Sequence, residues 1–225
     1  MPIKQSIFIK NITSVIINII DYMMIKLKKV KNRRLVDVKE KIVESIRLHK
    51  ELVERFEKTG IDMVLDISKT IINSLNKNGC IYLCGNGGSA ADAQHIAGEL
   101  IGRFKKNRKA LPAVALSTDT SILTCISNDF RFEDIFSRQL EALLRPADVL
   151  WALSTSGKSP NIISAAKLAR EKGVKVIAFT GKSGSKLEEI SDICLSVNTD
   201  ASSNAQEIHQ LAYHIICELV ENEFS

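Results

Sequence analysis

The chain lacks any uncharged stretch long enough to cross a lipid bilayer. In its apolar first 34 residues, Lys10 and Asp21 limit the longest uncharged run to residues 11–20, whereas a membrane-spanning helix needs about 20 apolar residues. No small-residue cleavage site follows, so a secretory signal is not predicted. Residues 1–34 are open to two interpretations. In the first, they form a basic amphipathic helix that contacts a membrane or a partner. In the second, which we favour, they are a poorly ordered extension.

An excess of basic residues is absent from the body of the chain. The whole chain has a net charge of +5, but residues 1–34 hold eight Lys or Arg side chains against Asp21 alone. That segment therefore carries +7, and the rest of the chain carries −2. A basic surface for nucleic acid is excluded for the body. We assign residues 1–34 to an N-terminal extension and residues 35–225 to one folded domain.

Paired cysteines and metal-type cysteine spacings are also lacking. The five cysteines are an odd number, and Cys80 and Cys84 are separated by three residues, which is not a zinc-ligand spacing. On a strand, these two would share one face. Cys80, Cys84, Cys194 and Cys217 lie in apolar runs. We interpret all five as reduced thiols of a cytoplasmic protein.

Five short runs rich in Val, Ile and Leu alternate with helical patterns along the chain. Strands buried on both faces have this near-continuous apolar character, and the alternation predicts an α/β fold with a parallel sheet. The predicted strands are residues 80–84, 112–116, 148–153, 174–179 and 192–197. The predicted helices are residues 36–56, 61–79, 90–103, 132–144, 160–171, 184–190 and 203–222. In such sheets, ligands bind beyond the carboxyl ends of the strands.

Two loops at predicted strand ends are built to hold an anion. The sequence GNGGS, residues 85–89, follows the first strand, and Ser89 and Asp92 have the spacing of a capping box for the next helix. The sequence STSGKSPN, residues 154–161, follows the third strand, with Ser159 as the predicted N-cap and Pro160 in the first helical position. Hydroxyl groups and free N–H groups at helix starts suit a phosphate monoester.

Two nucleotide sites are weighed against this interpretation. GNGGSA matches a dinucleotide-binding pattern, but its acidic partner would be Asp119, about ten residues too far along the chain. The sequence GKS occurs at residues 157–159 and 181–183. Because Ala152 and Val176 stand where a P-loop needs its first glycine, no nucleotide-triphosphate loop is present.

Acid–base side chains are predicted on the exposed faces of two helices. His95 and Glu99 lie four residues apart, opposite an apolar stripe at residues 90, 93, 97, 100 and 101. Such a pair can bind a divalent metal or share a proton-transfer site. On the last helix, Gln206 and His214 lie off the core stripe formed by Ile208, Leu211, Ala212, Ile215, Ile216 and Leu219. His209 lies at the edge of that stripe, and spacing alone does not choose between the two histidines.

The chain resembles the sugar isomerase (SIS) domain of phosphoheptose isomerases over residues 38–222. Four motifs carry the resemblance: CGNGGSAADAQHIAGEL, SNDFRFEDIFSRQLEAL, LSTSGKSPN and AQEIHQLAYH. It implies a three-layer SIS fold, with a five-stranded parallel sheet flanked by helices and an N-terminal helical extension. It also implies a cytoplasmic homotetramer whose sites lie between subunits, and an isomerase that interconverts sedoheptulose 7-phosphate and D-glycero-D-manno-heptose 7-phosphate for lipopolysaccharide and other surface glycans.

The resemblance also implies roles for particular residues. Glu99 and His214 would be the acid–base pair for an enediol mechanism, and one Zn²⁺ per subunit would polarise the carbonyl group. The zinc ligands would be His95, Glu99, Gln206 and His214. The phosphosugar would be bound by Asn86, Gly87, Gly88, Glu99, Asn128, Asp129, Ser154, Thr155, Ser156, Ser159 and Gln206.

Two features bear on alternative functions. Asn204 and Ala205 precede Gln206 where these isomerases usually have Arg and Ile, so an isomerase of another phosphosugar is one alternative. A non-catalytic adaptor of the same fold, such as the DnaA-associating replication initiation factor, or a sugar-phosphate sensor, is the other. The adaptor branch has Asn at the position of His214, so the histidine favours an enzyme.

Overall fold

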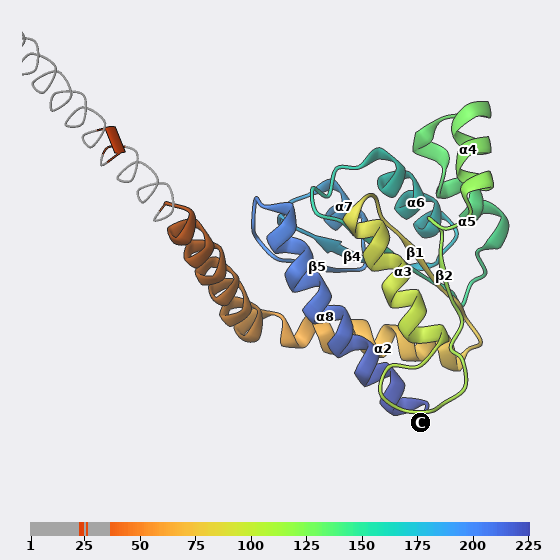
Figure 1. The fold of residues 1–225 in the computed structure, drawn as a ribbon. Coiled ribbons are helices and arrows are strands. Elements are labelled where there is room, and N and C mark those ends of the chain that lie inside the picture. Colours follow the sequence, from red (N-terminus) through yellow and green to blue (C-terminus); the bar gives the residue numbers. More distant parts are fainter. Residues whose placement is uncertain (1–22, 25, 27–36) are drawn as a thin grey trace, which may run out of the picture. The chain divides into compact units, whose positions relative to one another are not determined.

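The computed structural model describes residues 23, 24, 26 and 37–225 (Figure 1). Both interpretations of residues 1–34 therefore concern a segment that lies outside the described residues, apart from three positions. The chain divides into two units, residues 1–50 and 51–225, each described by itself. In the first, residues 37–50 are helical, and an ion pair joins Arg47 and Glu44 at 2.7 Å on the helix surface.

The second unit is built on a parallel sheet. Its described residues form five strands in the order β2-β1-β3-β4-β5, and every neighbouring pair is parallel. The strands are β1 (Ile81–Cys84), β2 (Ala113–Ala115), β3 (Val149–Ser154), β4 (Lys175–Thr180) and β5 (Ile193–Ser196). All five predicted strands and their parallel arrangement are confirmed.

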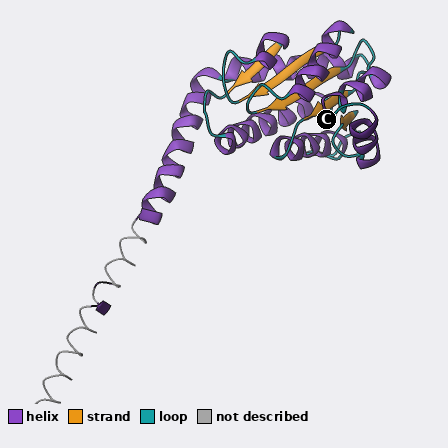
Figure 2. Cartoon of the chain, turned by 90° about the horizontal axis from the view of Figure 1, so that it is seen from above, coloured by secondary structure: helices purple, strands orange, loops and turns teal. Residues whose placement is uncertain are grey.

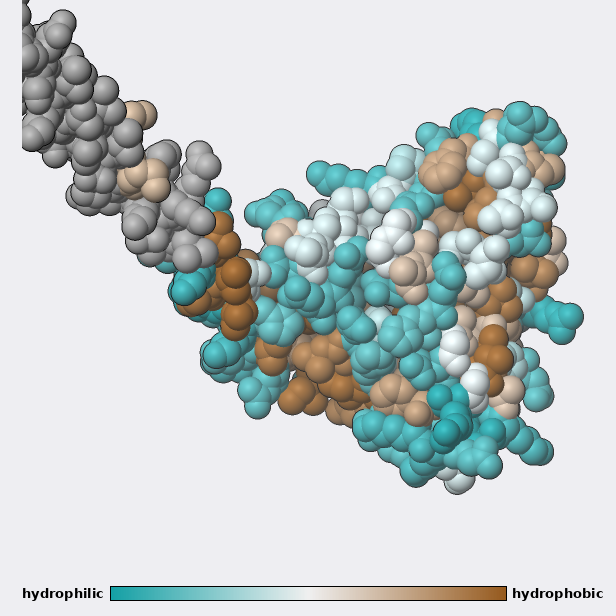
Figure 3. Space-filling view, viewed as in Figure 1, coloured by the Kyte–Doolittle hydropathy of each residue, from teal (hydrophilic) through white to brown (hydrophobic). Residues whose placement is uncertain are grey.

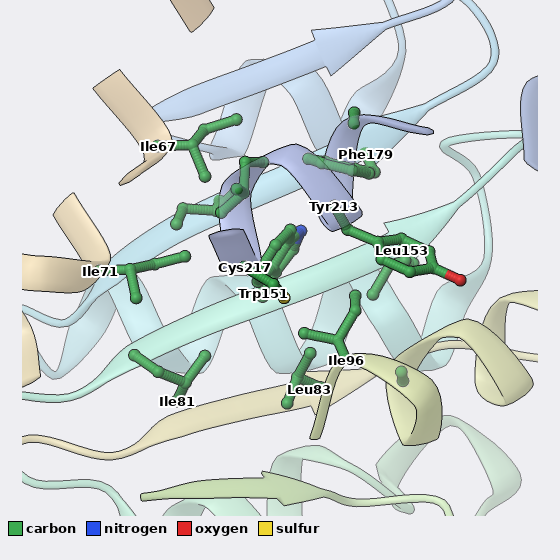
Figure 4. Packing of buried hydrophobic residues seen from close by; sticks show 14 of the residues in the cluster. Ile67, Ile71, Ile81, Leu83, Ile96, Trp151, Leu153, Phe179, Tyr213 and Cys217 are labelled. Carbon is green, nitrogen blue, oxygen red and sulfur yellow. The ribbon is translucent and has the colours of Figure 1, made fainter. Parts of the chain in front are cut away.

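Helices cover both faces of the sheet, as expected for strands that are apolar on both sides (Figure 2). One face packs against α2 (Ile61–Asn76), α3 (Gly88–Ile101) and α8 (Ser202–Glu223). The other packs against α5 (Ser137–Leu143), α6 (Pro160–Glu171) and α7 (Lys186–Ile190). In β3, Trp151 and Leu153 face the first layer (Figure 4), and Leu150 and Ala152 face the second. The three-layer α/β fold is confirmed.

Two helix predictions need correction. The predicted helix 132–144 is a short 3₁₀ turn, η1 (Phe132–Asp134), followed by α5. Helix α4 (Thr120–Asp129) was not predicted, because it lacks a clear apolar stripe: of its residues, all described, Ile126 alone is buried. A side-chain cap compensates at its start, where the Asp119 carboxylate accepts a hydrogen bond from the Ile122 N–H at 2.9 Å.

The core face of α8 is shifted around the helix from the predicted stripe, which is therefore only partly confirmed. Ile208, Ala212 and Ile216 are buried as expected. The other three residues of the predicted stripe instead line a groove of about 490 Å³ between α8, α2 and the residues preceding α2, where Figure 3 shows hydrophobic surface. These three residues are Leu211, Ile215 and Leu219. None of the described helices combines the length and the hydropathy that a membrane span requires.

The strand order points to a binding cleft at one place. The chain builds outward from β1 in one direction with β2 and in the other with β3, β4 and β5. Parallel sheets of this order bind ligands where the direction changes, beyond the carboxyl ends of the two central strands. Here those strands are β1 and β3, paired up to Cys84 and Ala152. The two loops predicted to bind an anion leave the sheet at this point.

Candidate active site

The glycine-rich turn between β1 and α3 depends on two glycine backbones. Gly87 has φ 53° and ψ −122°, a combination that side chains disfavour, and α3 begins directly after it at Gly88. The predicted capping box is wrong: Ser89 is buried in the first turn of the helix, and none of the described side chains caps α3. At Gly88, a Cβ atom would lie 2.5 Å from Nε2 of Gln206, so the missing side chain makes room for this amide.

The serine-rich loop after β3 gathers its hydroxyl groups. The Oγ atom of Ser154 lies 3.2 Å from that of Ser159 and 3.5 Å from that of Ser156. Ser159 precedes α6 and Pro160 occupies its first turn, as predicted, but the Ser159 hydroxyl contacts Ser154 instead of capping the helix. Gly157 has φ +61°, which turns the loop back. The hydroxyls therefore converge at the N-terminal, partially positive end of α6.

Side-chain hydrogen bonds join the two loops. The amides of Asn86 and Asn161 pair reciprocally, with N···O distances of 2.9 and 2.8 Å. The Thr155 hydroxyl donates to Ser202 Oγ at 3.0 Å, which ties the serine loop to the start of α8. The expectation that both loops form one site is thus supported by direct contact. Asn161 was not singled out from the sequence, because nothing in its local pattern shows which loop it faces.

Three side chains that the sequence placed on two separate helices come together. Nε2 of His95 lies 3.0 Å from Oε1 of Glu99 and 3.4 Å from Nε2 of His214. One donor atom from each of the three lies within 4.8 Å of the others, an arrangement that could hold a metal ion. Helices α3 and α8 run side by side in the same direction, which Figure 1 shows. This packing aligns His95 with His214.

The half-buried His214 packs against three aromatic rings. The Phe104 ring stacks on its imidazole at a centroid distance of 5.6 Å, and Tyr213 and His95 present their rings at steep angles at 4.8 and 5.0 Å. Burial, and then the neighbouring His95, lower the pKa of His214, while Glu99 opposes them. The neutral imidazole, which can accept a proton or bind a metal, is therefore favoured.

His209 belongs to the core. Its side chain is buried and its ring lies 5.1 Å from that of Phe179. Its Nε2–H donates to the Thr180 carbonyl at 3.1 Å. Burial lowers the pKa of His209 to about 4, so it is neutral at physiological pH. The structure thus resolves the ambiguity left by spacing: His214, not His209, lies at the site.

Three predicted site residues lie outside the three-residue group. Gln206 is eight residues before His214, about 12 Å along the helix, and its amide lies against Gly88. Asn128 and Asp129 are exposed at the end of α4. Their hydrogen bonds are local, from the Asn128 amide to Asp129 at 2.8 Å and from the Cys125 thiol to Asp129 at 3.4 Å.

Sequence reasoning missed a buried ionic contact that supports the site. The Glu221 carboxylate accepts hydrogen bonds from the backbone N–H groups of Phe104, Lys105 and Lys106 at 2.8, 2.6 and 2.9 Å. Arg108 lies 3.4 Å from the same carboxylate, and both side chains are 1% exposed. These contacts fix the loop after α3 and hence the Phe104 ring over His214.

Comparison with known proteins identifies the family of the chain. Residues 46–181 match the SIS domain family, which places the chain in the class of SIS-domain proteins. Phosphoheptose isomerase of Akkermansia muciniphila is 50% identical over 157 residues, which make up 70% of this chain and 83% of that protein. That of Aliarcobacter butzleri is 44% identical over 188 residues, 84% of this chain and 100% of that protein.

A solved structure extends the likeness to three dimensions. The phosphoheptose isomerase of Neisseria gonorrhoeae superposes with a TM-score of 0.78 at 38% identity, covering 82% of this chain and 99% of that one. At these identities and coverages, the chain belongs to the phosphoheptose isomerase family.

Proposed function

We propose that this protein isomerises sedoheptulose 7-phosphate to D-glycero-D-manno-heptose 7-phosphate, an early step toward ADP-heptose and surface glycans. The observation that carries the proposal is the convergence of His95, Glu99 and His214 on α3 and α8, the two helices whose starts contact the loops that follow β1 and β3. Family membership supplies the substrate, because relatives at 44–50% identity are named phosphoheptose isomerases. Ketose and aldose interconvert when a proton moves between C1 and C2 through an enediol.

The two loops would hold the substrate at its phosphate end. The hydroxyls of Ser154, Ser156 and Ser159 converge at the start of α6, where N–H dipoles favour an anion. Thr155, Asn86 and the backbone of Gly87 and Gly88 would line the adjoining wall. Ser154 is buried and the loops are cross-linked by the Asn86–Asn161 pair, so this part of the site is rigid before substrate binds.

Glu99 and His214 would share the proton transfers. The Glu99 side chain is 20% exposed and faces His95, and the pKa of His214 is lowered chiefly by burial. Of a carboxylate and a neutral imidazole, one can remove and return the carbon-bound proton, and the other can transfer protons to and from the sugar oxygens.

The same residues suit one Zn²⁺ per subunit. Two imidazoles and a carboxylate are a common zinc-ligand set. His95, Glu99 and His214 would bind the ion. Gln206, whose amide lies against Gly88, is the proposed fourth ligand and would have to turn from Gly88 toward the ion. When bound, zinc would polarise the carbonyl oxygen of the sugar.

We also propose a cytoplasmic homotetramer with sites shared between subunits. The hydrophobic groove lined by Leu211, Ile215 and Leu219 offers apolar surface for a second copy. Asn128 and Asp129 would reach the sugar hydroxyls of a neighbouring site, which accounts for their exposure on α4. The five free thiols suit the reducing cytoplasm.

Turnover of sedoheptulose 7-phosphate with zinc present tests the proposal. Wild type is expected to be active, whereas Glu99→Gln and His214→Gln should lose about 10²–10⁴-fold in kcat, the usual contribution of an acid–base group. Glu218→Gln, one helical turn after His214 and exposed, is the matched control and should retain activity. An inactive wild type would refute the function, and active Glu99→Gln and His214→Gln variants would refute the assigned roles. A panel of other phosphosugars tests the Asn204–Ala205 difference.

A further inference from the structure

Behind His95, on the side away from Glu99, lies a pair of polar residues that the proposed function leaves unexplained. The Tyr213 hydroxyl lies 3.0 Å from Nδ1 of His95. Tyr213 is fully buried, and Figure 4 shows its ring in the core beside Leu153 with the hydroxyl pointing outward. Asp92 lies one helical turn before His95, and its Oδ2 atom is buried with no hydrogen-bond partner among the described residues. An acceptor without a donor is costly to bury.

Asp92 and Tyr213 act on one another. Burial is the main reason that the pKa of Tyr213 is raised, and the charge of Asp92 is the next. Burial also raises the pKa of Asp92, against the opposing effects of the nearby His95 and Tyr213 side chains. The Tyr213 hydroxyl, 3.0 Å from Nδ1 of His95, therefore has a second acceptor nearby in the carboxylate of Asp92.

The state of His95 decides which partner the hydroxyl serves. A carboxylate can only accept, so the 3.0 Å contact of Nε2 with Glu99 requires a proton on Nε2. In the neutral imidazole, Nδ1 is then bare and accepts from the Tyr213 hydroxyl, which leaves Oδ2 of Asp92 without a donor. If the lone pair of Nε2 instead faces a cation, the imidazole proton is on Nδ1. The Nδ1–H group then donates to the Tyr213 hydroxyl oxygen. The hydroxyl hydrogen is then free to rotate toward Asp92.

We propose that Tyr213 and Asp92 are positioning residues that satisfy His95 in both tautomers and so stabilise the metal-binding one. The tautomer change leaves the proton count of the imidazole unchanged: one N–H is lost at Nε2 and one is gained at Nδ1. Asp92 supplies the acceptor that the second tautomer needs, which explains its unpaired oxygen. This inference rests on the proposed metal site. Second-shell partners of this kind change metal affinity by about 10–100-fold.

Zinc affinity, measured by competition with a chelator, tests the pair. Tyr213→Phe is expected to weaken zinc binding by about 10–100-fold, and Asp92→Ala should also weaken it. Because the two residues act in series, the double variant should bind no more weakly than Tyr213→Phe alone. Tyr82→Phe is the matched control, because Tyr82 is a buried tyrosine in the core on the other face of the sheet, with its hydroxyl 3.5 Å from the Leu143 carbonyl. It should leave zinc affinity unchanged.

The outcomes separate this inference from the proposed function. A wild type that takes up no zinc overturns the metal site and this inference with it. A wild type that binds zinc, with both single variants unchanged or with additive losses, overturns the positioning pair alone. Histidine ¹⁵N shifts provide a test without any variant of the pair, with His95→Gln used only to assign the signal. His95 should carry its proton on Nε2 without zinc and on Nδ1 with zinc, and one tautomer in both states would refute the proposal.

Discussion

Replacing Glu221 by Gln is expected to destabilise the protein by about 3–5 kcal/mol, the usual effect of breaking a buried ion pair. Glutamine keeps one acceptor oxygen for three backbone N–H groups and turns an N–H₂ group toward the others. Each lost bond to the charged carboxylate is worth about 1.5–3 kcal/mol. Arg108, 1% exposed, loses its counter-charge. Some relaxation of the loop after α3 keeps the total below the sum of these effects.

The assay is thermal unfolding at neutral pH. For a domain of this size, about 1 kcal/mol shifts the melting temperature by 2–4 °C, so a decrease of roughly 6–20 °C is expected. Glu218→Gln is the matched control: its ion pair with Lys105 at 2.7 Å is exposed, at 42% and 58% of the side chains, and should contribute less than about 1 kcal/mol. A Glu221→Gln variant as stable as Glu218→Gln would show that the carboxylate does not hold the loop.

The effect of Glu221 should also depend on pH. Although burial opposes it, backbone N–H groups from Lys105, Phe104 and Lys106, together with Arg108, hold the pKa of this carboxyl below its usual value. A lowered folded-state pKa contributes stability above the unfolded pKa, about 4.3, and loses it as pH falls through the folded value. The difference between wild type and Glu221→Gln should therefore be complete at pH 7 and shrink below about pH 4. A difference that grows in acid would contradict this.

Three further predictions concern α3, the core and the serine loop. Gly88→Ala should reduce activity, because its Cβ would lie 2.5 Å from Nε2 of Gln206. Gly98→Ala on the same helix, with open space around its Cβ, should raise the free energy of unfolding by about 1 kcal/mol. His209, with a pKa lowered by burial to about 4, should make wild type lose stability as pH falls from 6.5 toward 4. Urea unfolding of His209→Gln should lack that loss. Ser154→Ala should raise KM for the phosphosugar several-fold with kcat nearly unchanged, and a lowered kcat with unchanged KM would argue against phosphate binding there.

The sheet and most helices could be predicted from the sequence because buried strands and helices have characteristic spacings of apolar residues. Helix α6 has the predicted bounds, since Pro160 marks its start and its apolar residues repeat at helical spacing. The capping box failed because the positive φ of Gly87 lets α3 begin one residue before Ser89. Helix α4 was missed because it is stabilised by a side-chain cap and buries few side chains, so it has no apolar stripe in the sequence.

The site was predictable only as separate pieces. The i, i+4 spacing placed His95 and Glu99 on one face, and the resemblance selected His214. What no local pattern contains is the parallel packing of α3 on α8, which brings His214 within 3.4 Å of His95. The same holds for Tyr213, which the sequence did not single out and whose hydroxyl reaches His95 only in the folded chain. Long-range packing, not residue type, supplied the missing information.

The side-by-side helices α3 and α8 have one more consequence. Since His95, Glu99 and His214 all come from one polypeptide, the proposed zinc site would need no second protomer for these three ligands. At dilutions that separate the proposed subunits, each copy should still bind its metal ion. Turnover of the sugar phosphate should decrease, because Asn128 and Asp129 would no longer reach the site of a neighbouring subunit. As the protein concentration falls, metal content per chain should therefore stay constant while the specific activity decreases.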